Sequence, residues 1–181
     1  MEKIAIIGKA RSGKSTVLEL MKKIYTEEGK LVLHYDVSHA LYPITETLFP
    51  GSIYGEHKDR SKLQLVGQTI RKYDPNFWIS AMERAIYQDE SFIKCVDVLI
   101  VTGVRQPNEY QYLKDNNFQI IKVDTFKENR QLRAEKEGDI NYKETFEHET
   151  EKYIDNFKAN FIISNNNSKE DLEYKVRLLL A

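Results

Sequence analysis

The feature that most constrains the fold lies within the first sixteen residues. Residues 8–16 read Gly-Lys-Ala-Arg-Ser-Gly-Lys-Ser-Thr, which satisfies the pattern G-x-x-x-x-G-K-S/T. The apolar run of residues 4–7 precedes the motif and a segment with helical spacing follows it, as in a strand–loop–helix unit. Such a loop turns backbone N–H groups and a helix N-terminus toward phosphate oxygens. The chain is therefore predicted to bind a nucleoside triphosphate; a simple glycine-rich turn is the competing interpretation.

The loop also predicts individual contacts. Lys14 is expected to reach the β- and γ-phosphates, and the Ser15 hydroxyl is expected to ligate Mg²⁺. The predicted cofactors are therefore ATP and Mg²⁺. The predicted ATP-binding residues are Gly8, Ala10, Arg11, Ser12, Gly13, Lys14, Ser15 and Thr16.

Size and charge exclude several other classes of function. A chain of 181 residues builds one substantial core, so we expect a single domain over residues 1–181. A formal net charge of −1 gives no reason to expect nucleic acid or an anionic membrane as a partner. The single cysteine, Cys95, excludes an internal disulfide and fits a cytoplasmic protein. Oligomeric state is left open, with a homodimer as one option.

Apolar runs alternate with helical patterns along the chain. Strands are predicted at residues 31–36, 96–101, 118–123 and 161–163 in addition to the first run. Gly29 is placed to end the first helix, and Ser168 to begin the last. Strands separated by helices pair in parallel through right-handed crossovers. The prediction is a three-layer α/β fold of the P-loop NTPase type, with a five-stranded parallel sheet.

Two insertions interrupt this alternation, at about residues 38–92 and 125–158. Both are longer than a crossover requires. Ligands of open α/β sheets bind beyond the carboxyl ends of the strands, where such insertions emerge. We interpret the first as a helical substrate-binding insertion and the second as a lid; decorative or disordered insertions are the alternative.

One face of the helix predicted at residues 59–72 carries polar groups at spacings of four, three and four. They are Arg60, Gln64, Gly67 and Arg71. The arginines offer planar forks for phosphate oxygens, the glutamine can bind a base or sugar edge, and the glycine permits close approach. A solvated face is the alternative. Asp74 is predicted to cap the following helix, and the apolar stripe of that helix predicts that Trp78 lies in the core; a base-stacking role is the alternative.

These residues resemble the substrate-domain signature of the phage-type deoxynucleoside monophosphate kinases, which have a P-loop fold. The signature here is Arg60-x-x-Leu63-Gln64-x-x-Gly67-x-x-x-Arg71-x-x-Asp74-Pro75-x-x-Trp78. The similarity continues through Asp36, Val104-Arg105-Gln106-Pro107-Asn108-Glu109 and His148-Glu149-Thr150-Glu151, in the family's order. It departs where the family has an aspartate after the third strand, because this chain has Gly103, and His39 stands where the family has a lysine.

The resemblance and the chemistry of the residues together predict a site. Acceptor binding is assigned to Asp36, Arg60, Gln64, Gly67, Arg71 and Arg105. The catalytic group is Lys14, Arg105 and two lid arginines, Arg130 and Arg133, which a helix would turn the same way. A salt-bridged, solvated helix is the alternative for the last two. His148 is expected either to position the lid or to lie on a solvated surface.

The predicted reaction transfers the γ-phosphoryl group of ATP to a (deoxy)nucleoside monophosphate. The ionised acceptor phosphate needs no general base, so catalysis reduces to positioning and charge stabilisation. One alternative is a kinase of a small alcohol such as dephospho-coenzyme A, with Asp36 as the base. Another, prompted by Gly103, is a nucleotide-binding regulator without transferase activity. Base and sugar preference stay open at this stage.

Overall fold

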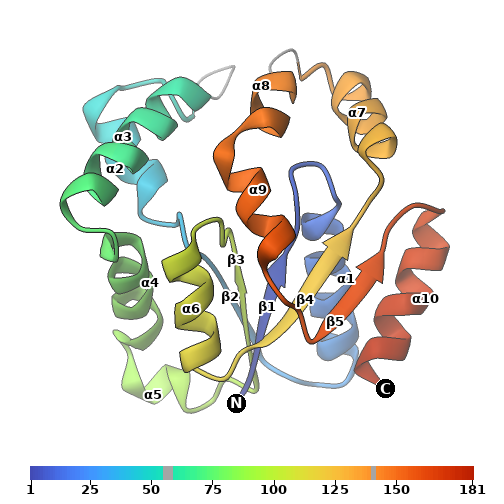
Figure 1. Cartoon of the computed structure of the whole chain (residues 1–181). Helices are drawn as coiled ribbons and strands as arrows, with labels where there is room; N and C mark the ends of the chain where they lie inside the picture. Colours follow the sequence, from blue (N-terminus) through green and yellow to red (C-terminus); the bar gives the residue numbers. More distant parts are fainter. Residues whose placement is uncertain (55–58, 140–141) are drawn as a thin grey trace.

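The computed structural model describes residues 1–54, 59–139 and 142–181 of the chain (Figure 1). Five strands form one sheet in the order β2-β3-β1-β4-β5, and every pairing is parallel. This confirms the predicted α/β fold with a five-stranded parallel sheet, the strand ends differing from the predictions by one or two residues. The strands are β1 (Glu2–Ile7), β2 (Val32–Asp36), β3 (Val98–Thr102), β4 (Gln119–Asp124) and β5 (Phe161–Ser164).

Helices cover both faces of the sheet, because alternate residues of the central strand β1 are buried on opposite sides. Ile4 and Ile6 pack with α1 (Lys14–Glu27) and α10 (Lys169–Leu180). Ala5 and Ile7 belong to the other core, which includes residues of α4 (Phe77–Tyr87), α6 (Pro107–Asp115) and α9 (Glu149–Asn156). Burial on both faces explains why β1 and β3 read as continuous apolar runs.

The two long connections are helical in the described residues. The first carries α2 (Leu41–Leu48), α3 (Arg60–Tyr73), α4 and α5 (Glu90–Ile93), and the second carries α7 (Lys127–Lys136), α8 (Tyr142–Glu147) and α9. In Figure 1, α2 and α3 stand beyond the carboxyl ends of the strands on one side, and α7 and α8 on the other. The loop after β1 emerges between them, since β3 and β4 flank β1. This is the switch point at which open α/β sheets bind ligands.

Local signals explain most helix ends. Gly29 has a φ of 75° directly after the first helix, and Ser168 caps α10 by accepting from the Asp171 N–H. The predicted cap at Asp74 is wrong, because α4 begins at Phe77. Asp74 still donates its N–H to Ile70 O at 2.9 Å and so ends α3. Its carboxylate then holds the turn between the helices rather than a helix N-terminus.

Trp78 lies in the core as predicted, with 1% of its surface exposed. Its indole Nε1–H donates to Gly67 O at 3.3 Å and so joins α4 to α3. Among the described residues, the structure has no helix long and apolar enough to cross a bilayer.

Candidate functional site

The loop between β1 and α1 is shaped by its glycines. Gly13 precedes α1 with a φ of 95°, in the left-handed region that glycine tolerates. At Gly8 a Cβ would lie 2.6 Å from Val123 O and 2.7 Å from Ser12 Oγ, so a side chain has no room. The Ser12 hydroxyl is buried and has no hydrogen-bond partner in the described structure. A tight loop that contains an unpartnered hydroxyl fits the predicted phosphate site.

Lys14 folds back over this loop. Its Nζ donates to Gly8 O at 2.8 Å and to Lys9 O at 2.7 Å. Burial, followed by repulsion from Arg105, lowers the pKa of the Lys14 amine to about 8. The amine is thus held by neutral carbonyls, which phosphate oxygens can replace.

The second insertion brings its two arginines onto the same loop. Arg130 is 5% exposed, and its Nη1 donates to Ala10 O at 3.2 Å and to Glu151 at 3.1 Å. Arg133 Nη1 lies 3.2 Å from Arg11 O and 3.3 Å from Ser12 O, and its Nη2 lies 2.8 Å from Asn165 O. Both side chains point from α7 to the loop, which excludes the solvated-helix alternative.

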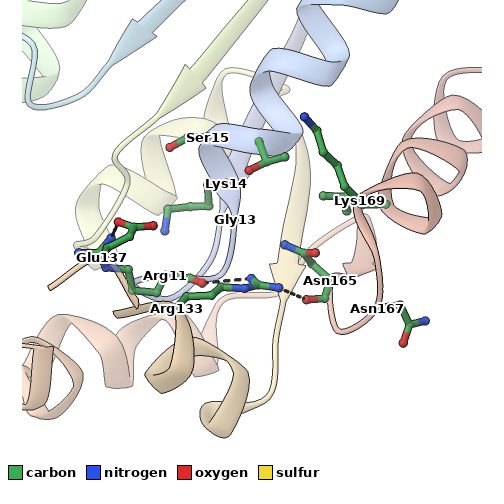
Figure 2. Close-up of a pocket in the computed structure, with 11 residues that line it drawn as sticks. Arg11, Gly13, Lys14, Ser15, Arg133, Glu137, Asn165, Asn167 and Lys169 are labelled. Carbon is green, nitrogen blue, oxygen red and sulfur yellow. Dashed lines mark hydrogen bonds and ion pairs between the residues drawn. The ribbon is translucent and has the colours of Figure 1, made fainter. Parts of the chain in front are cut away.

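Figure 2 shows a pocket of about 470 Å³ on the outer side of the loop, between the loop, the end of α7 and the start of α10. Arg133 spans from the loop to Asn165, which follows β5, and Arg11 pairs with Glu137 at the end of α7. Arg11 Nη2 also lies 2.5 Å from Asp139. The pocket reaches the start of α1 and of α10, and its lining includes Gly13, Lys14, Ser15, Thr16, Asn165, Asn167 and Lys169.

A second pocket, of about 550 Å³, lies on the inner side of the loop and extends to the first insertion. Lys14 and Ser15 line both pockets, so the start of α1 stands where the two meet. Four of the predicted acceptor residues line the second pocket: Asp36, Gln64, Arg71 and Arg105. The lining also includes Gln68, Thr102 and His148, to which no acceptor role was assigned from the sequence.

The remaining predicted acceptor residues are Gly67 and Arg60. Gly67 is not part of the pocket lining; a Cβ there would lie 3.4 Å from Arg71 Nη1 and 3.5 Å from Cδ2 of Leu41 in α2. Arg60 begins α3, but its side chain lies outside what the structure describes. The roles predicted for these residues stay predictions.

Glu109 anchors Arg71 and the backbone at Arg105, a role that the sequence analysis did not assign to it. It is 2% exposed, and its Oε1 accepts from Arg71 Nη2 at 2.8 Å. Its Oε2 accepts the backbone N–H groups of Arg105 at 2.7 Å and Gln106 at 3.0 Å. The available signal was its place three residues after Gln106, at the start of α6.

The structure explains why residue 103 is glycine. Gly103 has a φ of 80°, and a Cβ there would lie 2.3 Å from the Asp36 Oδ1. The Asp36 carboxylate accepts from Ser38 N at 2.9 Å and from Thr102 Oγ1 at 3.0 Å, which holds it over the end of β3. The Asp36 carboxylate of β2 therefore occupies the space that a side chain at residue 103 would need.

The donor atoms present suit Mg²⁺. Mg²⁺ prefers oxygen ligands and keeps much of its shell for water and substrate phosphates. Ser15 and Asp36 supply such oxygens in the inner pocket. In residues 1–54, 59–139 and 142–181 no group of three or more His, Cys, Asp or Glu side chains forms a metal cage.

Comparison with known proteins supports the fold. Neither a protein-family model nor a curated protein matches this chain. Among solved structures it is similar to TT1252 from Thermus thermophilus, with a TM-score of 0.60, 21% identity and coverage of 99% of this chain and 97% of that chain. It is also similar to shikimate kinase from Acinetobacter baumannii (TM-score 0.51, 17% identity, coverage 99% and 93%). A third similar structure is a sugar kinase from Janibacter, with a TM-score of 0.53, 14% identity and coverage of 99% of this chain and 94% of that chain. The chain therefore has the fold found in P-loop kinases.

Proposed function

We propose that this chain transfers the γ-phosphoryl group of ATP to the phosphate of a (deoxy)nucleoside monophosphate. The observation that carries the proposal is the pair of arginines, Arg71 and Arg105, in the same pocket as Lys14. Lys14 belongs to the triphosphate loop, whereas Glu109 binds the side chain of Arg71 and the backbone N–H of Arg105. Cations on both sides of one pocket suit a reaction in which donor and acceptor are both anionic.

The residues then divide the work of transfer. The loop and Lys14 bind the triphosphate, while Arg71 and Arg105 hold the acceptor phosphate in line with it. The acceptor oxygen is already ionised near neutral pH, so no residue has to remove a proton. Ser15 would hold Mg²⁺, with Asp36 facing its water shell, and the ion would offset charge on the phosphates.

The similar structures support the coarser part of this proposal. Two of them carry the names of kinases for small molecules, shikimate and a sugar. The same fold and an intact phosphate loop support an ATP-dependent phosphotransferase here. The nucleoside monophosphate as acceptor is supported by the arginines and by the resemblance of the helix α3 residues to the phage-type kinases.

The test is a panel assay with purified protein and Mg²⁺-ATP. Each ribo- and deoxynucleoside monophosphate is offered separately, with dephospho-coenzyme A, shikimate and simple sugars as alcohol acceptors. Formation of a nucleoside diphosphate that Lys14→Met abolishes supports the proposal. ATP binding without transfer to any acceptor rejects it in favour of a nucleotide-binding regulator.

One observation favours an alcohol kinase as the second candidate. Asp36 lines the acceptor pocket, and its carboxylate is held by Ser38 and Thr102. A carboxylate held in this way can accept the proton of an attacking hydroxyl. Replacement Asp36→Asn separates the two reactions. In a monophosphate kinase, kcat should fall less than about tenfold, whereas an alcohol kinase should lose about 10²-fold or more in kcat.

A further inference from the structure

Glu151 is a buried carboxylate to which the proposed reaction gives no role. It lies in the first turn of α9 and is 4% exposed. Its Oε1 and Oε2 lie 3.0 Å and 3.2 Å from the backbone N of Ala10, in the phosphate loop. Its Oε2 also lies 3.1 Å from Arg130 Nη1. A buried carboxylate needs such partners, because an unpartnered charge is very unfavourable away from water.

Arg130 binds the backbone carbonyl of Ala10, the residue whose N–H is bound by Glu151. Its Nη1 donates to Ala10 O at 3.2 Å, and its guanidinium lies 4.5 Å from the centre of the Phe146 ring. The N–H and the C=O of Ala10 are therefore bound by the two members of one ion pair. We call this arrangement of Glu151, Arg130 and the Ala10 backbone the Ala10 clamp.

The start of α9 directs Glu151 into the clamp. His148 is the N-cap of this helix, and its Nδ1 accepts the Thr150 N–H at 3.3 Å. The cap fixes the first turn, so the residue three positions after it projects to a defined place. This gives a reason for the spacing of His148 and Glu151. It also favours the lid-positioning alternative for His148, whose ring lines the acceptor pocket.

The phosphate loop has a conformation that needs such support. Arg11, directly after Ala10, has a φ of 62°, which is uncommon for a residue other than glycine. Conformations of this kind persist where the surrounding structure fixes them. A buried ion pair is on average no more stabilising than apolar residues of the same size. Fixing the geometry of the loop is thus a better account of the pair than overall stability.

We propose that Glu151 is a positioning residue that, with Arg130, holds Ala10 so that the loop is shaped for a triphosphate before the nucleotide binds. The inference rests on the proposed function only in taking ATP as the ligand of this loop. It assigns Glu151 no contact with substrate. Its effect passes through the backbone of Ala10.

The test compares Glu151→Gln with Glu149→Gln, an exposed residue of the same helix. Affinity for Mg²⁺-ATP is measured by calorimetry, and exchange of the Ala10 amide hydrogen by NMR without nucleotide. Glu151→Gln should weaken ATP binding about tenfold and accelerate Ala10 exchange by a similar factor. Glu149→Gln should change neither. Removing a negative charge near the phosphates would by itself strengthen binding, so weaker binding reports the loss of positioning.

Unchanged or tighter ATP binding by Glu151→Gln overturns the inference, as does unchanged Ala10 exchange. If the wild-type protein binds no ATP, the proposed function fails, and the exchange measurement alone decides about the clamp. If Glu151→Gln does not fold, Arg130→Lys replaces it, because lysine keeps the charge but not the planar geometry. If Arg130→Lys binds Mg²⁺-ATP as tightly as the wild type and its Ala10 amide exchanges at the wild-type rate, the clamp is rejected.

Discussion

The donor and acceptor sides of the site hold their cations in different ways. On the donor side, Lys14 and Arg133 bind main-chain carbonyls of the phosphate loop and of Asn165. On the acceptor side, Arg71 is paired with the buried carboxylate of Glu109. Carbonyls are neutral, so they offset none of the positive charge of Lys14 and Arg133, whereas the Glu109 carboxylate offsets part of the charge offered to the acceptor. Arg130 and Arg11 are the donor-side exceptions, since Glu151 and Glu137 pair with them.

This difference predicts how each side fails. A donor-side change should alter the shape or charge of the loop, and hence ATP affinity. An acceptor-side change should leave ATP binding intact and alter the acceptor KM. Glu151 is where the two sides meet, since it binds Arg130 and lies 3.9 Å from Arg105.

The largest effect is expected on the acceptor side. Arg71→Met should raise the acceptor KM about 50-fold, because a charge-assisted contact to the phosphate is lost and Glu109 is left buried without its partner. Steady-state kinetics with varied acceptor, and calorimetry with ATP, measure the two sides separately. Arg84→Met, an exposed arginine of α4, is the matched control. A parallel loss of ATP affinity would show that the two sides are not independent.

Sequence reasoning reached the fold and the loop because both depend on local patterns. The apolar runs predict the strands, and the glycines at residues 8 and 13 predict a tight loop between the first strand and the first helix. Glu109 and Glu151 lie in stretches that resemble the family, but the sequence assigned them no role, since an acidic residue on a charged helix looks the same whether it faces solvent or a buried partner. Their partners lie 38 and 141 residues away along the chain. Only the packed structure brings such pairs together.

Gly103 illustrates the same limit from the other direction. The sequence lacks an expected aspartate, which prompts the alternative of a nucleotide-binding regulator without transferase activity. The structure shows that Asp36 lies over Gly103 and leaves no room for a side chain there. The room at residue 103 is thus limited by a residue on another strand, which the sequence alone does not reveal.

An intermediate effect is expected from pH on the donor side. Because the pKa of Lys14 is lowered to about 8 in the free protein, the amine loses its proton above that pH. Bound phosphates favour the charged form, so ATP affinity should be constant below pH 8 and fall about tenfold by pH 9. Calorimetry from pH 6.5 to 9.5 measures this. In Lys14→Met, any remaining ATP affinity should not decrease between pH 8 and pH 9. A decrease that persists in that variant would assign the titration to another group.

The smallest effect is expected from Arg133→Met, even though this arginine makes three hydrogen bonds. All three go to main-chain carbonyls, so its loss should loosen the loop and its junction with Asn165. We expect a decrease of about 2 kcal/mol in the free energy of unfolding and a decrease in ATP affinity of only a few-fold. Urea denaturation and calorimetry measure these, with Arg84→Met again as the control. A loss of ATP affinity near 10²-fold with little change in stability would mean instead that Arg133 leaves the carbonyls and binds the nucleotide directly. The donor side would then use its arginines as the acceptor side does.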